Sequence, residues 1–432
     1  MSNAWLLLGL ILLFDIYIAG YIPFNWWKKS KSKVVRTLMS WVDAIVYALV
    51  LVYFIFNFVG QNYQIPSSSL EKTLLTGDYL FVNKMVYGPR VPITPVHFPL
   101  VHNKMPDILG GGNSYTSWPQ TRYHRLPGLR NVEAGDIVVF NFPAGDTVAT
   151  KYEESSMYYY QLIKERGWKE VNTNKEEYGD IIYRPVDRRT NFVKRAVGLP
   201  GQILRIADDV LYIDGKPQKF PENVQFNYLI TPARNLTVDY IRSLGIALGD
   251  VQTQPNGQIF LPLTREMLKK MDADGYILKA ERRTFTSEEL GDALFPEGIS
   301  RHWSLSDYGG SNGIWIPKKG VTLKNLNASN WPIYERVIRN YEGHPNSYVK
   351  DGQVYIDGKP AGEYTFTMDY YFMMGDNRDN SQDSRFWGFV PEDHIIGTPM
   401  LVLISFDQER GIFDGGIRWD RIFRTPNPDK TK

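Results

Sequence analysis

The stretch Tyr370-Tyr-Phe-Met-Met-Gly-Asp-Asn-Arg-Asp-Asn-Ser-Gln-Asp-Ser-Arg-Phe-Trp-Gly-Phe-Val-Pro391 places a dense polar segment between two apolar ones. The apolar run from Tyr370 to Met374 predicts a β-strand. The polar residues that follow, Asp376 to Ser384, need many hydrogen-bond partners if they are buried. A solvated turn is the simpler interpretation, but such turns do not usually end in Arg-Phe-Trp-Gly-Phe-Val. The pattern favours a hydrogen-bonded, ion-paired framework beside an active site.

Strand character recurs along the rest of the chain. Apolar or alternating runs bounded by Gly, Pro and Asp predict strands at 79–83, 137–142, 192–197, 203–206, 210–213 and 400–405. These runs predict a mainly β protein built on an antiparallel β domain.

Helix signals are concentrated between residues 237 and 343. Thr286-Ser-Glu-Glu289 is a capping box, and Pro332 follows Asn330 at the start of a second helical pattern. They predict an α+β insertion at 221–350, besides a shorter insertion near 144–190. The segments 211–217 and 354–360 both contain Tyr-Ile-Asp-Gly-Lys-Pro, a hairpin signal. We expect the β domain to pause near residue 217 and to resume near 354.

Two apolar segments near the N-terminus are long enough to cross a bilayer as helices. They run from about Trp5 to Pro23 and from about Trp41 to Gly60. The linker between them carries the basic residues Lys28, Lys29, Lys31, Lys33 and Arg36. The positive-inside rule places this linker in the cytoplasm and everything after the second span outside it. The predicted organisation is a first transmembrane helix at 1–25, a basic linker at 26–40, a second transmembrane helix at 41–60, the β domain at 61–220 and 351–432, and the insertion at 221–350.

Composition excludes several kinds of chemistry. The 432 residues include no cysteine, so disulfides, thiolate metal sites and cysteine nucleophiles are ruled out. Only six histidines occur, with no H-E-x-x-H pair, so a zinc site is not expected. A net charge of +2 gives no reason to expect a nucleic-acid partner. The sequence predicts no metal and no cofactor.

The serine-rich segment Pro66-Ser-Ser-Ser-Leu-Glu-Lys-Thr-Leu74 lies just beyond the second span. It could be a polar juxtamembrane linker. Ser69-Leu-Glu-Lys72 also matches the S-x-x-K of penicillin-binding enzymes, but their S-D-N and K-T-G elements do not occur in the chain.

Lys194 lies within a predicted strand, where it and Arg195 point to opposite faces. One of the two cations is therefore expected to be partly buried, unless Lys194 sits on an edge strand with its amine in water. Burial would lower the pKa of a lysine toward neutrality, and only the neutral amine can take a proton from a serine hydroxyl.

These motifs resemble those of the bacterial type I signal peptidase family. The family's P-S-x-S-M-x-P-T-L stands here as Pro66–Leu74, its G-D-I-V-V-F as Gly135–Phe140 and its K-R-x-V-G-L-P-G as Lys194–Gly201. The resemblance implies a serine peptidase whose nucleophile is Ser69 and whose general base is Lys194. It implies further roles, namely an oxyanion hole from the Ser69 backbone N–H and the Ser67 hydroxyl, orientation of Lys194 by Ser381, and the ion pairs Asp376 with Arg195 and Asp383 with Arg385.

The resemblance also implies a substrate and a location. The substrates would be preprotein signal peptides with small residues at −3 and −1, cut at the outer face of the bacterial cytoplasmic membrane by a multi-pass enzyme. The lipid bilayer and the translocation machinery would be its partners. Two positions depart from the family: Leu70 replaces Met, and Lys72 replaces Pro, which places a second amine near Ser69. We prefer Lys194 as the base because nothing in the polar segment around Lys72 would lower its pKa.

Two rival functions are weaker. A self-cleaving Ser–Lys repressor shares the chemistry, but the two spans and the lack of a DNA-binding region argue against it. A catalytically inactive membrane-anchored binding module would not need Ser69, Lys194 and Ser381 together.

Overall fold

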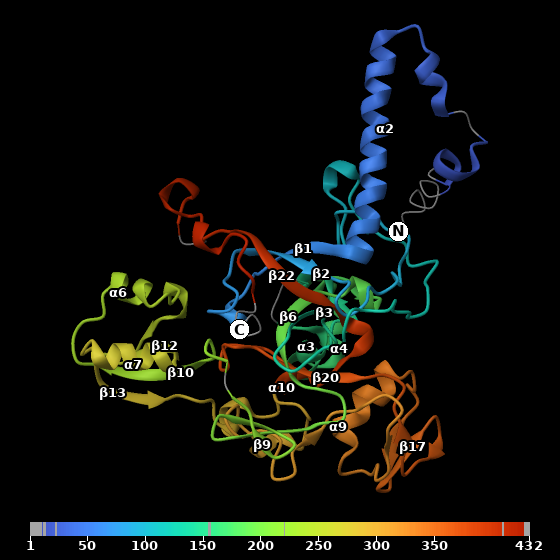
Figure 1. Ribbon diagram of the computed structural model, residues 1–432. Coiled ribbons are helices and arrows are strands. Elements are labelled where there is room, and N and C mark those ends of the chain that lie inside the picture. The colour runs from blue at the N-terminus through green and yellow to red at the C-terminus, as the bar shows by residue number, and fades with distance from the viewer. Residues whose placement is uncertain are drawn as a thin grey trace. The chain divides into compact units, whose positions relative to one another are not determined.

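The computed structural model describes residues 11, 14–21, 24–153, 157–219, 221–407 and 410–426 (Figure 1). The chain divides into two compact units. Unit 1 comprises residues 1–61, 82–131 and 144–191, and unit 2 comprises residues 62–81, 132–143 and 192–432.

Unit 1 contains the long helix α2 (Lys33–Phe54), which continues as the π-helical turn η3 (Ile55–Val59). Ser32 caps its N-terminus by accepting a hydrogen bond from the Val35 backbone N–H. Lys33–Val59 has a mean hydropathy of 2.2 over its most apolar window, none of which is buried. It is the one helix in the described part of the chain that is long and apolar enough to cross a membrane. The helix therefore begins well before the start predicted near residue 41.

The predicted first span falls largely outside the described residues. The described part of it contains one π-helical turn, η1 (Asp15–Ala19).

The segment 144–191 of unit 1 is a small α+β element with its own core. Strands β4 (Thr147–Ala149) and β5 (Ile181–Tyr183) pair antiparallel. Three short helices lie between them along the chain: α3 (Tyr159–Arg166), α4 (Trp168–Thr173) and α5 (Lys175–Tyr178). Their buried side chains are Ala149, Tyr159, Leu162, Val171 and Tyr178. The insertion predicted near 144–190 refers to this segment and stays a prediction.

Unit 2 is organised around a seven-stranded sheet with the order β1-β2-β22-β3-β6-β20-β21. The strands are β1 (Gly60–Gln64), β2 (Asp78–Asn83), β3 (Ile137–Asn141), β6 (Asn191–Gly198), β20 (Tyr370–Met374), β21 (Val390–Pro391) and β22 (Ile395–Ser405). The pairs β22–β3, β20–β6 and β20–β21 are antiparallel, as predicted. Strand β6 is interior, between β3 and β20, and Met374 of β20 lies opposite its Arg195.

Both predicted hairpins form. The first joins β8 (Val210–Ile213) to β9 (Lys216–Pro217), and the second joins β17 (Gln353–Ile356) to β18 (Lys359–Pro360). In each, the Asp-Gly pair has positive φ at both residues, with Asp214 at 52° and Asp357 at 47°. Aspartate and glycine tolerate this left-handed conformation, which tight hairpin turns require.

The other short strands extend these hairpins or form small sheets. One sheet has the order β14-β7-β8-β9, another β16-β17-β18, and β15 pairs with β19. Their bounds are β7 (Ile203–Ala207), β14 (Ile314–Trp315), β15 (Thr322–Leu323), β16 (Tyr348–Lys350) and β19 (Tyr364–Thr365).

The predicted insertion at 221–350 splits into two parts with different cores. Its first part is a four-stranded sheet with the order β11-β12-β10-β13, packed with helices α6 and α7 around Ile230, Leu261, Leu263 and Met271. The bounds are β10 (Gln225–Pro232), α6 (Val238–Ser243), β11 (Gln252–Thr253), β12 (Ile259–Thr264), α7 (Arg265–Ala273) and β13 (Ile277–Arg282). We name residues 225–282 the insertion sheet.

The second part of the predicted insertion does not stand apart from the β domain. Leu294, Tyr308, Trp331 and Ile338 pack in one core with side chains of β7, β8 and β20. The helices here are α8 (Ser287–Leu290), with the predicted capping box, and α9 (Trp331–Arg336), which continues as the π-helical turn η10 (Val337–Tyr341). Apolar side chains distant in sequence therefore share one core here, and the single insertion at 221–350 stays a prediction.

The remaining elements are short. They are the helix α10 (Ser384–Trp387) and the 3₁₀ turns η2 (Phe24–Lys29), η4 (Ser68–Leu70), η5 (Asp107–Leu109), η6 (Thr150–Tyr152), η7 (Val186–Arg188), η8 (Leu248–Asp250), η9 (Ser300–His302), η11 (Glu392–His394), η12 (Ile412–Asp414) and η13 (Trp419–Arg421).

Candidate active site

Ser69 lies in the 3₁₀ turn η4, on the connection between β1 and β2. Its neighbour Leu70 is fully buried, and so is Leu74, which anchors the turn to the core of unit 2. Ser69 itself is 7% exposed. The turn therefore holds Ser69 at the edge of the core with only a small part of its surface exposed.

Ser67 lies just before the turn in extended backbone conformation and is exposed. Its hydroxyl donates to Ser69 Oγ across 3.5 Å, which is at the outer limit of a hydrogen bond. The two hydroxyl groups implied for nucleophile and oxyanion hole are thus neighbours.

Lys194 lies on the interior strand β6 and is buried, with 5% exposure. Burial lowers the pKa of its amine to about 8, although the negative charge of Asp383 opposes the shift. Arg195, on the other face of the strand, is buried too. The sequence predicted partial burial for only one of these cations, but both faces of β6 are covered at these two residues. An edge-strand lysine in water is excluded.

The polar segment that follows β20 lies against Ser69. The Asn377 backbone N–H donates to the Ser69 carbonyl oxygen at 3.1 Å, and the Asn377 side chain donates to the Ser68 carbonyl oxygen at 3.3 Å. A β-carbon placed on Gly375 would lie 2.5 Å from the Ser69 carbonyl oxygen and 2.2 Å from Ser381 Oγ. Residues far apart in sequence, Ser69 and Ser381, therefore meet at a glycine.

Ser381 is buried, and among the described residues its hydroxyl has no hydrogen-bond partner. A buried hydroxyl without a partner is costly and needs an explanation. A hydroxyl kept to orient a catalytic amine would be one.

A buried ion pair joins β6 to this loop. The Arg195 guanidinium donates to both oxygens of Asp376, at 2.8 and 2.7 Å, and also to the Gly135 carbonyl oxygen at 2.8 Å. Burial alone would raise the pKa of Asp376, but Arg195 outweighs it and keeps that pKa below its usual value. Thr73 donates to the same carboxylate at 2.7 Å. The segment that carries Ser69, which we call the nucleophile segment, is therefore tied to the Arg195–Asp376 pair.

A second buried pair closes the other end of the loop. Asp383 caps helix α10 and accepts from the Arg385 side chain at 2.9 and 2.8 Å. It also accepts from the Gly375 backbone N–H at 3.1 Å. Both ion pairs suggested by the sequence therefore occur, and both have their carboxylates fully buried.

Lys72 turns away toward the insertion sheet. Its amine donates to the carbonyl oxygens of Leu244, at 2.7 Å, and Gly245. The expectation that nothing would lower its pKa was wrong: burial lowers it, with the charges of Glu71 and Asp250 acting in the opposite direction. However, hydrogen bonds donated to two carbonyl oxygens favour the protonated ammonium, which cannot act as a base.

Sequence reasoning missed several residues that shape the site. Gly375, Asn377 and Asp379 were visible within the polar stretch, yet their individual contacts were not. Thr73 and Arg282 gave no local signal, because their partners are distant in sequence. Within the described residues, no group of three or more histidine, aspartate or glutamate side chains could hold a metal ion.

Unit 2 contains a serine in a tight turn and a buried lysine whose pKa is lowered toward neutrality. Serine hydrolases that use a lysine as general base need these two groups. Comparison with known proteins identifies the family. The family described as "Signal peptidase, peptidase S26" matches residues 38–261 and 361–404, more than half of the chain. The chain therefore belongs to this signal peptidase family, and the relatives described below are each named "Signal peptidase I".

Relatives support this, two of those described here over most of the chain and one over a short stretch. A "Signal peptidase I" of Buchnera aphidicola subsp. Baizongia pistaciae is 24% identical over 410 residues, covering 93% of this chain and 88% of the relative. A "Signal peptidase I" of Haemophilus influenzae is 22% identical over 403 residues, covering 92% and 78%. A "Signal peptidase I" of Aquifex aeolicus is 67% identical over 36 residues, which are 8% of this chain and 14% of the relative.

Proposed function

We propose that this protein is a membrane-bound serine endopeptidase that removes N-terminal signal peptides from translocated preproteins, with Ser69 as nucleophile and Lys194 as general base. The observation that carries the proposal is the burial of the Lys194 amine, which lowers its pKa to about 8. A substantial fraction of that amine is neutral near physiological pH, whereas an exposed lysine would be almost wholly protonated.

The chemistry is acyl transfer. The Lys194 amine takes the proton from Ser69 Oγ, which attacks the scissile carbonyl carbon to give a tetrahedral oxyanion. The Ser69 backbone N–H and the Ser67 hydroxyl donate hydrogen bonds to that oxyanion. The Lys194 ammonium then donates its proton to the departing amine, which leaves an ester on Ser69. Water, deprotonated by the same amine, attacks the ester and releases the signal peptide.

The loop from Gly375 to Asp383 supports this chemistry by position. Ser381 orients the Lys194 amine, and its own unpaired hydroxyl favours that role. The pair Arg195–Asp376 holds β6 against the nucleophile segment through Thr73. The pair Asp383–Arg385 holds the far end of the loop.

The proposed substrates are preproteins with small residues at −3 and −1. Relatives named "Signal peptidase I" favour this class, as does the position of Ser69, which follows the α2–η3 helix closely in the sequence. The lipid bilayer and the translocation machinery are the proposed partners.

The proposed topology has two spans, a cytoplasmic basic linker and a catalytic unit on the outer side of the bacterial cytoplasmic membrane. Its support is the apolar helix Lys33–Val59 together with the basic residues that precede and begin it.

The assignment is tested by measuring cleavage of a preprotein in detergent by the wild type and by the variants Ser69→Ala, Lys194→Met and Lys72→Met. We expect loss of activity in the first two and retention in Lys72→Met. Full activity in Ser69→Ala would remove the proposal. Activity that survives in Lys194→Met but is lost in Lys72→Met would make Lys72 the base.

A further inference from the structure

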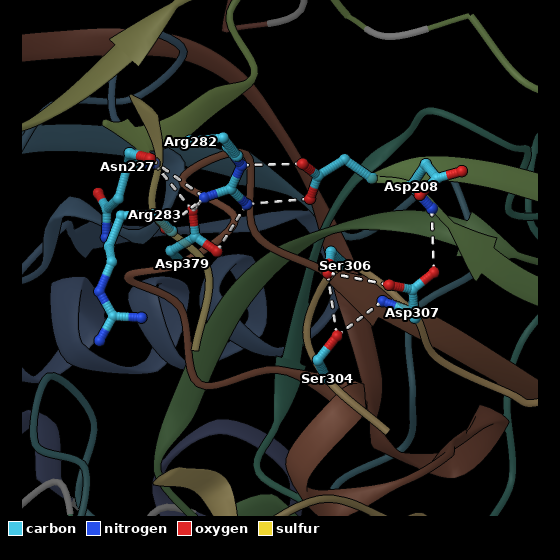
Figure 2. A network of polar contacts seen from close by, with 9 residues as sticks. Asp208, Asn227, Arg282, Arg283, Ser304, Ser306, Asp307 and Asp379 are labelled. Atoms are coloured by element: carbon cyan, nitrogen blue, oxygen red, sulfur yellow. Dashed lines mark hydrogen bonds and ion pairs between the residues drawn. The ribbon is translucent and has the colours of Figure 1, made fainter. Parts of the chain in front are cut away.

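Arg282, the last residue of β13, places its guanidinium between two carboxylates (Figure 2). It donates to Asp209 through Nε and one terminal nitrogen, at 2.8 and 2.9 Å. It contacts Asp379 through both terminal nitrogens, at 3.0 and 2.8 Å. Asp209 lies in the β7–β8 turn, whereas Asp379 lies in the loop that carries Ser381. One side chain therefore connects the insertion sheet to the active-site loop.

The Asp379 carboxylate depends on the insertion sheet. Its side chain is fully buried, and besides Arg282 it accepts a hydrogen bond from the Asn227 backbone N–H of β10 at 2.8 Å. A buried carboxylate that loses its partner carries a large desolvation cost. The loop that carries Asp379 is therefore held firmly against Arg282 and Asn227.

The backbone of the loop is held by the same strand. Gln225 of β10 donates its N–H to the Asp376 carbonyl oxygen at 2.9 Å and accepts from the Arg378 N–H at 3.0 Å. Residues 376–379 are thus bound along one side by β10 and at Asp379 by β13.

The nucleophile segment meets the same insertion sheet. Lys72, three positions after Ser69, donates to the carbonyl oxygens of Leu244 and Gly245, just after helix α6. Both segments that meet at the active site are therefore attached to residues 225–282.

We infer that Arg282 is a positioning residue for the peptidase reaction: through Asp379 it fixes the loop that sets Ser381 and Asp376 beside Ser69. Because the buried Ser381 hydroxyl has no hydrogen-bond partner among the described residues, its place is set by the loop backbone. Arg282 lies in the stretch 262–360, outside the residues that the signal peptidase family matches. The inference rests on the proposed function of Ser69 and Lys194 and adds the insertion sheet to it.

The test compares Arg282→Gln with Arg283→Gln in the full-length enzyme in detergent, with a purified preprotein carrying alanine at −3 and −1 as substrate. Arg283 is the matched control, since its side-chain hydrogen bonds go to Glu289 and the Thr284 carbonyl oxygen, and Asp379 acts on it through charge alone. We expect Arg282→Gln to lower kcat about 10- to 100-fold, because misplaced catalytic groups cost that much. KM should change much less than kcat, and Arg283→Gln should match the wild type.

The pH profile separates positioning from general stability. A loosened loop admits water to the Lys194 amine, so the acidic limb of kcat/KM should move to higher pH in Arg282→Gln. The inference would be overturned if Arg282→Gln had both the acidic limb of kcat/KM and the kcat of the wild type. The dyad assignment would survive that result, since it fails only if Ser69→Ala or Lys194→Met stays active.

A double-mutant cycle identifies the route. If Arg282 acts through Asp379, Arg282→Gln combined with Asp379→Asn should be no less active than Asp379→Asn alone. If the double variant lost activity by the product of the two single-variant losses, Arg282 would not act through Asp379. Asp209→Asn, which removes the charge that attracts Arg282 to the β7–β8 turn but leaves the pair with Asp379, should retain most of the activity. A loss equal to that of Arg282→Gln would instead assign the whole network to stability. If Arg282→Gln does not fold, Asp379→Asn and Asp209→Asn alone make the same distinction, because only Asp379→Asn should lower kcat.

Discussion

A β-carbon on Gly375 would stand 2.2 Å from Ser381 Oγ, closer than any non-bonded approach allows. The same added carbon would stand 2.5 Å from the Ser69 carbonyl oxygen. The absence of a side chain at residue 375 is therefore what allows the nucleophile segment and the Ser381 loop to meet.

Gly375→Ala should therefore disable the enzyme by separating these two segments. We expect kcat to fall about 100-fold, as for a displacement of catalytic groups by about an ångström. The control is Gly362→Ala, where an added β-carbon meets nothing within 4 Å and φ is not in the left-handed region. Steady-state kinetics of both variants check this, and equal activity of the two would show that the close approach is not needed.

The pH dependence of activity should follow the Lys194 amine, whose pKa burial lowers to about 8. Because the neutral form is the base, kcat/KM should rise with pH and level off above about 8. A profile that is flat between pH 6 and 9, measured on the free enzyme under kcat/KM conditions, would contradict a lysine base with that pKa.

The same shift makes a prediction about stability. Between about pH 8 and the ordinary lysine pKa of 10.5, the unfolded chain binds a proton at Lys194 that the folded chain does not, so this group makes the folded state more stable as pH rises. Below pH 8, folding must bury a lysine amine that is protonated, which costs free energy. Lys194→Met removes this cost and should be more stable than the wild type below pH 8, by on the order of 3 kcal/mol. The gain should vanish as pH rises through that window, as thermal unfolding at a series of pH values would reveal.

Lys72 has a left-handed backbone, with φ at 69°, at the position where the family usually has proline. The proline ring fixes φ near −65°, so Lys72→Pro must rebuild the turn that follows Ser69. Lys72→Gly keeps the backbone and removes only the amine. We expect Lys72→Gly to retain more activity than Lys72→Pro in a preprotein cleavage assay. The reverse order would mean that the site does not need a left-handed backbone at this position.

The pair Arg195–Asp376 should contribute mainly to shape, and breaking it should be costly. Arg195→Met leaves the buried Asp376 carboxylate without its cation, which costs about 3–5 kcal/mol of unfolding free energy. Replacing both residues, as in Arg195→Met with Asp376→Leu, should recover part of that loss. Denaturant unfolding checks the series, with Arg283→Met on the exposed Arg283–Glu289 pair as a control that should show no measurable change. If the double variant were as unstable as Arg195→Met alone, the buried charge of Asp376 would not be the cause of the lost stability.

Because the chain has no cysteine, single introduced cysteines can report its topology. On intact cells, a membrane-impermeant maleimide should label Ser329→Cys in the catalytic unit but not Ser30→Cys in the basic linker. Labelling of both after the cells are opened is the control. Labelling of Ser30→Cys in intact cells would invert the proposed orientation.

The sequence by itself determined the elements whose signals are local. The strands at 79–83, 137–142 and 370–374 and both Asp-Gly hairpins form because alternation, apolar runs and left-handed turn residues act within a few positions. The site residues were predicted from motifs that are also short runs of sequence, and their roles stay predictions.

Only the tertiary structure decided what surrounds those residues. Lys194 and Arg195 are both buried because other parts of the chain cover both faces of β6, which no pattern along β6 could report. Residues 294–338 share a core with β7 and β20. Arg282 reaches Asp379 across nearly a hundred positions, and Lys72 reaches Leu244 across more. Burial, pKa and ion pairing arise from such distant contacts. The sequence of one segment does not show which distant residues will surround it in the folded chain.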